Sequence, residues 1–307
     1  MNLPSEIIIT DVGPRDGLQT LAERVPASVK VKLINKLIDA GLPEIEVGSF
    51  VSPKAVPQMA DTGEVFAAIK RDPGCVLSAL VPNRRGLDAA LEAKVDKVAI
   101  FASVTETFSQ KNTGGSIEEV HERLAEVARE TKAVGLPLRG YLSCVFDCPF
   151  EGRVFLGDVT DAAERLLELE IDELDLGDTL GTAGPTEVVE LLEAITEIVP
   201  IEKVVMHFHD TFGRGIASAW EAMRCGVTRF DSSCGGVGGC PFAPGATGNV
   251  ATEDLVALAE RCDVMTGVDL DAVVDAATLL RPFGASPTRA GSAYLAASAR
   301  MADRNAR

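Results

Sequence analysis

Short apolar runs rich in β-branched residues recur along the 307-residue chain, and each is followed by a longer segment with apolar residues at helical spacing. This alternation is typical of parallel strands joined by crossover helices. Eight such runs predict eight strands, at residues 6–12, 44–50, 75–81, 97–102, 138–144, 173–179, 204–210 and 229–234.

The longer segments predict eight helices. Ser28, Ser116 and Asp158 stand where N-caps are expected, and Glu119 is placed to complete a capping box with Ser116. The helices are expected at residues 28–40, 61–70, 84–94, 116–134, 158–170, 185–199, 214–225 and 251–260.

Eight consecutive strand–helix units predict an α/β protein with a closed (β/α)8 TIM barrel. The barrel is expected over roughly residues 5–262, and C-terminal helices over about 264–307. No Ser/Gly-rich linker or charge run interrupts the sequence. We therefore expect residues 1–307 to form a single domain.

The composition is that of a globular enzyme, and the charge excludes two classes of partner. Hydrophobic residues make up 46% of the chain, and the formal net charge is −17. A broadly negative surface repels phosphates, so neither nucleic acid nor an anionic membrane is an expected partner. The N-terminus lacks the pattern of a signal or transit peptide, and no apolar run reaches membrane-spanning length, so we expect a cytoplasmic protein.

Polar residues gather at the carboxyl ends of the predicted strands, where barrels of this type carry their chemistry. We expect them to converge on one face of the barrel. They are Arg15 and Asp16 after the first strand, Glu46 and Ser49 in the second, Asp178 in the sixth, and His207 and His209 in the seventh.

The His207–His209 pair is the sharpest local signal. Residues i and i+2 of a strand point to the same face and can offer two imidazole nitrogens to one ion. With a carboxylate oxygen from Asp16, the set suits octahedral Mg²⁺ or Mn²⁺ better than tetrahedral zinc. Two histidines and one carboxylate also describe a non-heme Fe(II) site, so an oxygenase is a rival function. A hydrogen-bonded polar layer inside the barrel is the alternative without a metal.

A glycine-rich run, CGGVGGCPFAPGATGN at residues 234–249, follows the eighth strand. It matches no nucleotide-binding motif, and its glycines predict a mobile lid at the barrel mouth. Cys240 in this run is either a proton donor or acceptor or a packing residue. The seven cysteines of the chain lack paired zinc spacing, and we expect reduced thiols.

The chain resembles the hydroxymethylglutaryl-CoA lyase family nearly from end to end. The motifs that carry the resemblance are VGPRDGLQ, EVGSFVSPK, FASVTETFSQKN, RGYLSC, LGDT, HFHDTFG and GGCPFAPGATGNVATEDL. The last is the most specific, because related metal-barrel acyl-CoA synthases share the Arg-Asp-Gly and His-x-His elements but not that loop.

The resemblance implies a TIM-barrel lyase, typically a homodimer, that uses a divalent cation to split an acyl-CoA substrate into acetyl-CoA and acetoacetate. It implies that Asp16, His207 and His209 bind the metal, with Asn249 as a further contact. Arg15 and Cys240 are implied as catalytic residues. Glu46 and Asp178 are implied as acidic support around metal and substrate, and we group Ser49 with them as a candidate substrate contact.

The chemistry of this cleavage accounts for these residue types. The substrate hydroxyl loses its proton, for which Asp16 and His207 are candidate carriers. The bond between the carbons alpha and beta to the thioester then breaks, and an enolate of acetyl-CoA forms. Permanently charged Arg15 suits the enolate oxygen, and Cys240 is a candidate to protonate the enolate carbon.

Two positions depart from the family pattern. Thr20-Leu21 stand where the family usually has Asn-Glu, and Ala55 stands where it usually has Trp. A methyl in place of an indole would enlarge the pocket, so citramalyl-CoA and a longer-branched 3-hydroxyglutaryl-CoA are alternative substrates; rim packing is the other explanation. A non-catalytic CoA-binding barrel is a further alternative, against which the intact set of predicted catalytic residues argues.

Overall fold

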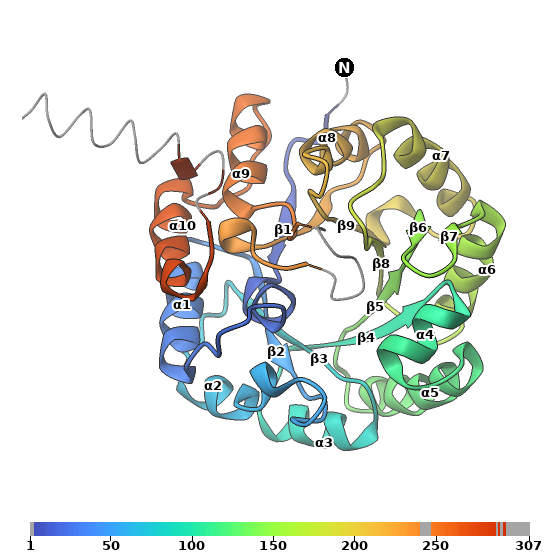
Figure 1. Ribbon diagram of the computed structural model, residues 1–307, viewed down its shortest axis with the longest axis horizontal. Coiled ribbons are helices and arrows are strands. Elements are labelled where there is room, and N and C mark those ends of the chain that lie inside the picture. The colour runs from blue at the N-terminus through green and yellow to red at the C-terminus, as the bar shows by residue number, and fades with distance from the viewer. Residues whose placement is uncertain (1–2, 240–246, 287, 289–290, 293–307) are drawn as a thin grey trace, which may run out of the picture.

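The computed structural model describes residues 3–239, 247–286, 288 and 291–292. Eight parallel strands close into a barrel in the order β1-β10-β9-β8-β5-β4-β3-β2, and helices form an outer ring around them (Figure 1). The predicted (β/α)8 fold is therefore confirmed. The strands are β1 (Ile8–Asp11), β2 (Glu44–Ser49), β3 (Val76–Leu80), β4 (Lys97–Ser103), β5 (Leu138–Ser143), β8 (Glu173–Asp178), β9 (Val204–Phe208) and β10 (Arg229–Ser232).

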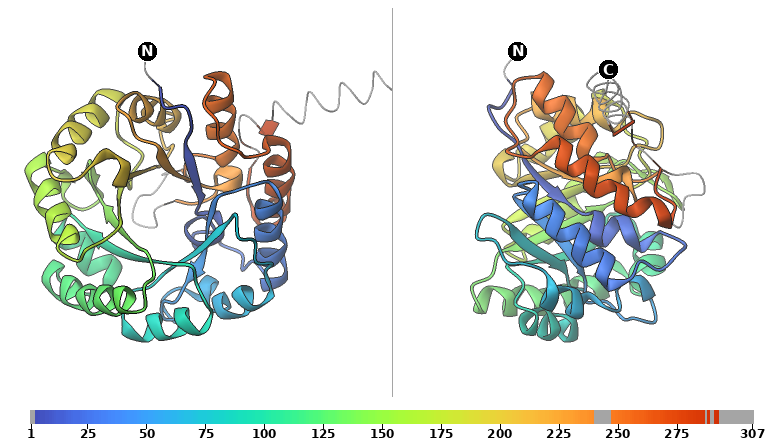
Figure 2. Two further views of the ribbon diagram at one scale, coloured as in Figure 1. Left: turned by 180° about the vertical axis from the view of Figure 1, so that it is seen from behind. Right: turned by 90° about the vertical axis from the view of Figure 1, so that its left-hand side faces the viewer.

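All eight predicted helices are present at their expected places. After them comes α10 (Leu270–Ala277), which packs beside α1 on the outside of the barrel (Figure 2). No helix in the described part of the chain is long and apolar enough to cross a membrane. The eight are α1 (Ala27–Asp39), α2 (Thr62–Ala68), α3 (Arg84–Glu92), α5 (Ile117–Ala133), α6 (Leu156–Leu167), α7 (Pro185–Thr196), α8 (Gly215–Arg224) and α9 (Thr252–Arg261).

Several elements of the described chain were not predicted. A π-helical turn, Gly13–Gly17, follows β1, and a hairpin of β6 (Asp147–Cys148) and β7 (Gly152–Arg153) follows β5. Helix α4 (Glu106–Thr113) precedes α5 and buries only Phe108 and Ser109. So small an apolar face leaves little periodic signal in the sequence.

One of the three predicted N-caps is confirmed, and two are wrong. The Ser116 hydroxyl accepts from Glu119 N at 3.2 Å, and Glu119 Oε2 accepts from Ser116 N at 2.8 Å, which forms the predicted capping box. Ser28 and Asp158 instead lie inside the first turns of α1 and α6, because these helices begin earlier than predicted. Asp158 still faces the positive end of the helix dipole.

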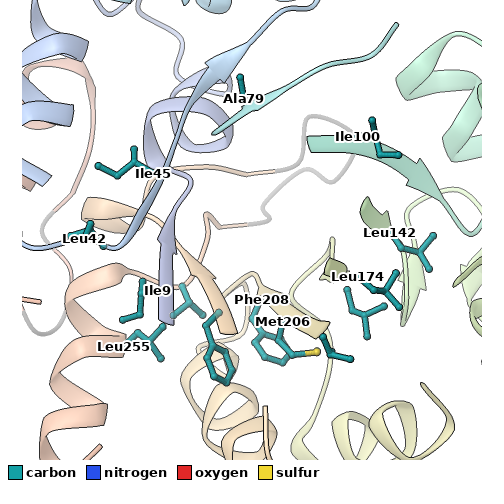
Figure 3. Close-up of a cluster of buried hydrophobic side chains, with 14 of the residues drawn as sticks. Ile9, Leu42, Ile45, Ala79, Ile100, Leu142, Leu174, Met206, Phe208 and Leu255 are labelled. Atoms are coloured by element: carbon teal, nitrogen blue, oxygen red, sulfur yellow. The ribbon is translucent and has the colours of Figure 1, made fainter. Parts of the chain in front are cut away.

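Successive residues of each strand alternate between the surrounding helices and the barrel axis. Apolar side chains such as Ile9, Ile45 and Leu174 pack in the layer between the strands and helices, with Leu255 of α9 in the same cluster (Figure 3). The axis-facing positions are strongly polar. Arg139 of β5 is 1% exposed and reaches Glu173 of β8 and Asp231 of β10. Polar side chains therefore fill the inside of the barrel below its mouth.

Candidate active site

The turn after β1 brings Arg15 and Asp16 to the barrel mouth. A Cβ atom at Gly17 would lie 2.6 Å from Val237 Cγ2, so only glycine allows this turn to pack against the loop after β10. The Arg15 guanidinium donates to Asp16 Oδ1 at 2.6 Å and forms a second ion pair with Glu46. It also lies 5.1 Å from the ring centroid of Tyr141. Arg15 is therefore a buried cation held on three sides.

His207 and His209 meet Asp16 at this mouth. Their ring centroids are 5.4 Å apart. One candidate ligand atom from each of Asp16, His207 and His209 lies within 4.8 Å of the other two. The structure thus brings together three predicted ligands, from the turn after β1 and from the end of β9, closely enough to share one cation.

Asn249 completes the cluster and shows that these donors fit a divalent cation. Its Nδ2 donates to Asp16 Oδ2 at 3.0 Å and to Val237 O at 3.1 Å. Its Oδ1, like Nδ1 of His209, is buried without a hydrogen-bond partner in the described part of the chain. Buried polar atoms without partners are rare. Imidazole nitrogens with carboxylate and amide oxygens suit Mg²⁺ or Mn²⁺.

The electrostatics of the site favour the ligand-competent forms of Asp16 and His209. Burial alone would raise the pKa of Asp16, but the charges of Arg15, His207 and His209 outweigh it and leave the pKa lowered. Burial lowers the pKa of His209 to about 4. Burial also opposes protonation of His207, but its hydrogen bond to Asp231 and the charges of Asp231 and Asp16 leave its pKa raised. Asp16 is therefore an anion and His209 a neutral imidazole at pH 7.

The other predicted site residues lie at different distances from this cluster. Glu46 is fully buried behind Arg15 and reaches the site through it. The Ser49 hydroxyl donates to Leu80 O at 3.3 Å and does not line the cavity. Asp178 shares the helix-facing side of β8 with Leu174 and accepts from the backbone of the following loop, at Thr182 N and Ala183 N. Cys240 lies outside the described residues.

A cavity of about 330 Å³ opens above the cluster. Its polar end is lined by Arg15, Asp16, Gln19, His207 and His209. Its other walls are largely apolar and include Phe101, Phe108, Val120 and Leu124. Ala55 is an exposed residue on the rim of this cavity, whereas Thr20 and Leu21 do not line it.

The residues near the site that were not predicted include Tyr141, Gln19 and Asp231. Tyr141 and Gln19 line the cavity, and Gln19 Nε2 lies 3.4 Å from Asp16 Oδ1. Asp231 accepts from Nδ1 of His207 across 3.1 Å. The sequence carried a signal for Asp231, because a charged residue inside a predicted barrel strand is buried and needs a partner.

A family model described as HMGL-like matches residues 6–280. The chain belongs to the hydroxymethylglutaryl-CoA lyase family. One relative, from Pseudomonas aeruginosa, is named 3-hydroxy-3-isohexenylglutaryl-CoA/hydroxy-methylglutaryl-CoA lyase. It is 46% identical over 278 residues, which cover 90% of this chain and 92% of that protein.

Solved structures of this lyase family superimpose closely on the chain. The HMG-CoA lyase from Bacillus subtilis has a TM-score of 0.93 at 40% identity, with 96% of this chain and 99% of that chain covered. An HMG-CoA lyase from Acinetobacter baumannii, in complex with coenzyme A and 3-methylmalate, has a TM-score of 0.90 at 35% identity, with 95% and 97% covered. The chain is therefore a carbon–carbon lyase of a family that depends on a divalent metal.

Proposed function

We propose that this lyase cleaves 3-hydroxy-3-methylglutaryl-CoA to acetyl-CoA and acetoacetate. The observation that carries the proposal is the meeting of Asp16, His207 and His209 beside the guanidinium of Arg15, inside one cavity. A hydroxyl to be deprotonated and an enolate oxygen to be stabilised call for such groups. The names of the relatives and the coenzyme A complex of one of them support an acyl-CoA substrate.

The atoms of the reaction balance with two proton transfers. The tertiary hydroxyl gives up its proton, the bond between C2 and C3 breaks, and C3 becomes the ketone of acetoacetate. The electron pair stays on C2 as the thioester enolate, which takes a proton to give acetyl-CoA. Arg15 lies at the polar end of the cavity, where its fixed charge would stabilise the enolate oxygen.

Asp16, His207, His209 and Asn249 would hold the cation. When bound, the cation supplies Lewis-acid polarisation of the substrate hydroxyl and lowers its pKa. Either Mg²⁺ or Mn²⁺ matches this oxygen and nitrogen set. Asp16 is the candidate carrier of the hydroxyl proton, because Nδ1 of His207 faces Asp231 and its Nε2 would bind the cation. Cys240 is proposed as the donor to the enolate carbon.

Acetyl-CoA release from HMG-CoA tests the proposal. We expect release with Mg²⁺ or Mn²⁺, its loss in EDTA, and its recovery when the cation is restored. Replacement of a proposed ligand, His209→Gln, should lower kcat at least about 100-fold. The matched control is His121→Gln on α5, because this third histidine of the chain lies outside the cluster. No release from HMG-CoA with either cation would refute the proposed function.

A 3-hydroxyglutaryl-CoA with a longer 3-alkyl branch is a second candidate substrate. The apolar wall of Phe101, Phe108, Val120 and Leu124 supports it, as does the small side chain of Ala55 on the rim. The name of one relative includes an isohexenyl substrate.

The named relatives are lyases, so the comparisons give no support to the Fe(II) oxygenase or to a non-catalytic barrel. Assembly as a homodimer and location in the cytoplasm stay predictions.

A further inference from the structure

A buried carboxylate lies directly behind one of the two histidines of the cluster. Asp231 of β10 is paired in register with His207 of β9, so the two side chains enter the barrel side by side. Oδ2 of Asp231 lies 3.1 Å from Nδ1 of His207. Asp231 is 3% exposed and lines no part of the substrate cavity.

The second oxygen of this carboxylate is fixed by Arg139. Nη1 of Arg139 donates to Oδ1 of Asp231 at 2.9 Å. Arg139 is itself held by Glu173 Oε2 at 2.7 Å and by Thr10 Oγ1 at 3.1 Å. The position of Asp231 is therefore set by a charge network anchored on strands at several points around the barrel.

This geometry decides which nitrogen of His207 carries the proton. A carboxylate that is ion-paired with a guanidinium only accepts hydrogen bonds, so Nδ1 of His207 must donate to it. In the neutral ring, Nε2 is then left with its lone pair. We propose that Asp231 is a positioning residue that holds His207 as the Nδ1-protonated tautomer, with Nε2 presented to the metal. The inference rests on the proposed metal-dependent function.

His207 and His209 differ in whether Nδ1 has a hydrogen-bond partner. Nδ1 of His209 is buried and has no hydrogen-bond partner in the described part of the chain, whereas Nδ1 of His207 is held by Asp231. A carboxylate behind a metal-binding imidazole fixes the ring and increases its basicity. The His207 ring is therefore preorganised before the cation arrives, and loss of Asp231 should weaken metal binding through His207.

Direct metal binding tests this role without use of the reaction. We expect Asp231→Asn to raise the Mn²⁺ dissociation constant by about 10- to 100-fold, as measured by electron paramagnetic resonance on metal-stripped protein. The matched control is Glu44→Gln. Glu44 also contacts Arg139, with 3.3 Å between Glu44 Oε2 and Arg139 Nη2, but forms no hydrogen bond with His207 among the described contacts. The E44Q variant should change Mn²⁺ affinity by less than about threefold.

Nitrogen-15 NMR of the histidine rings gives a second readout, which needs no variant to fold. In the metal-free wild-type protein, the neutral form of the His207 ring should carry its proton on Nδ1 and leave Nε2 unprotonated. The opposite tautomer would overturn the inference, as would unchanged affinity in D231N or equal weakening in E44Q. Failure of the wild type to bind Mn²⁺ would overturn the proposed metal site and this inference together, and is thus distinguishable from failure of D231N alone.

Discussion

Asn249 donates from Nδ2 to Oδ2 of Asp16 across 3.0 Å. The bond joins the end of the loop after β10 to the turn after β1, and so connects the last strand–helix unit of the barrel to the first. Gly238, with φ +136°, lies against Asn249, and a Cβ atom there would be 2.6 Å from Nδ2. Gly238 therefore packs against the side chain that orients Asp16.

Replacement of Asn249 should weaken metal binding more than it weakens the fold. Asn249→Ala removes an unpartnered oxygen from the cluster and frees one side of Asp16. We expect the Mn²⁺ dissociation constant to rise at least about tenfold in a calorimetric titration. The control is Asn35→Ala, which removes a bond to the Lys70 backbone N–H; neither Asn35 nor Lys70 lines the cavity. An N249A protein that binds Mn²⁺ as tightly as the wild type would show that Asn249 is not a ligand.

Substitutions in the Arg15–Glu46 ion pair should separate an effect on catalysis from an effect on stability. Arg15→Met should lower kcat by about 100- to 1000-fold, because the enolate loses its fixed cation. It should also destabilise the protein by roughly 3–5 kcal/mol, because Glu46 is left as an unpaired carboxylate at 0% exposure. The double variant R15M/E46Q should recover most of that stability in urea unfolding, while its kcat stays low. Recovery of kcat in the double variant would refute the role given to Arg15.

The sequence predicted the barrel well because its signals are local and periodic. Strand and helix periods are visible in single segments, and residues at the strand ends of a barrel share one mouth, so Asp16, His207 and His209 could be placed together. The prediction did not consider which face of its strand each strand-end residue occupies. Asp178 falls on the same face as Leu174 and Leu176, and this alternation places it toward the helices, where it accepts from the Thr182 and Ala183 backbone.

Other features depend on contacts that one sequence does not reveal. The pairing of Asp231 with His207 requires the register of β9 against β10, which follows only from the closed barrel. The N-cap predictions at Ser28 and Asp158 failed because Pro26 and Phe155 occupy the cap positions, two and three residues earlier. Helix ends are decided by such small differences in local geometry.

The buried ion pairs of Glu173, below the site, predict that acid lowers the stability of the fold. Glu173 is bound by Lys97 at 2.9 Å and by Arg139 at 2.7 Å. Burial raises its pKa, but these two cations outweigh burial and lower the pKa from 4.5 to about 2. The stability that Glu173 contributes is therefore complete above pH 4.5 and is lost as the pH falls toward 2.

Thermal unfolding between pH 6 and pH 2.5 measures this contribution. We expect Glu173→Gln to lower Tm at pH 6 and to flatten the decrease of Tm with acid relative to the wild type. Glu118→Gln is the control, because its pair with Arg165 is 68% exposed on the glutamate side and contributes little. Parallel curves for E173Q and the wild type would show that the ion pairs of Glu173 do not stabilise the fold.

Replacement of Ala55 tests whether its small side chain enlarges the substrate pocket or only packs at the rim. Ala55 is exposed, yet it lines the cavity whose walls include Phe101 and Phe108. If the space beside it holds a branched acyl group, Ala55→Trp should lower kcat/KM for a 3-hydroxyglutaryl-CoA with a six-carbon 3-alkyl group, relative to HMG-CoA, by at least about tenfold. Ala60→Trp is the control, because Ala60 is exposed on the same loop region but does not line the cavity. Equal selectivity in A55W and A60W would assign position 55 to rim packing, since a residue that bounds the substrate must discriminate by its volume.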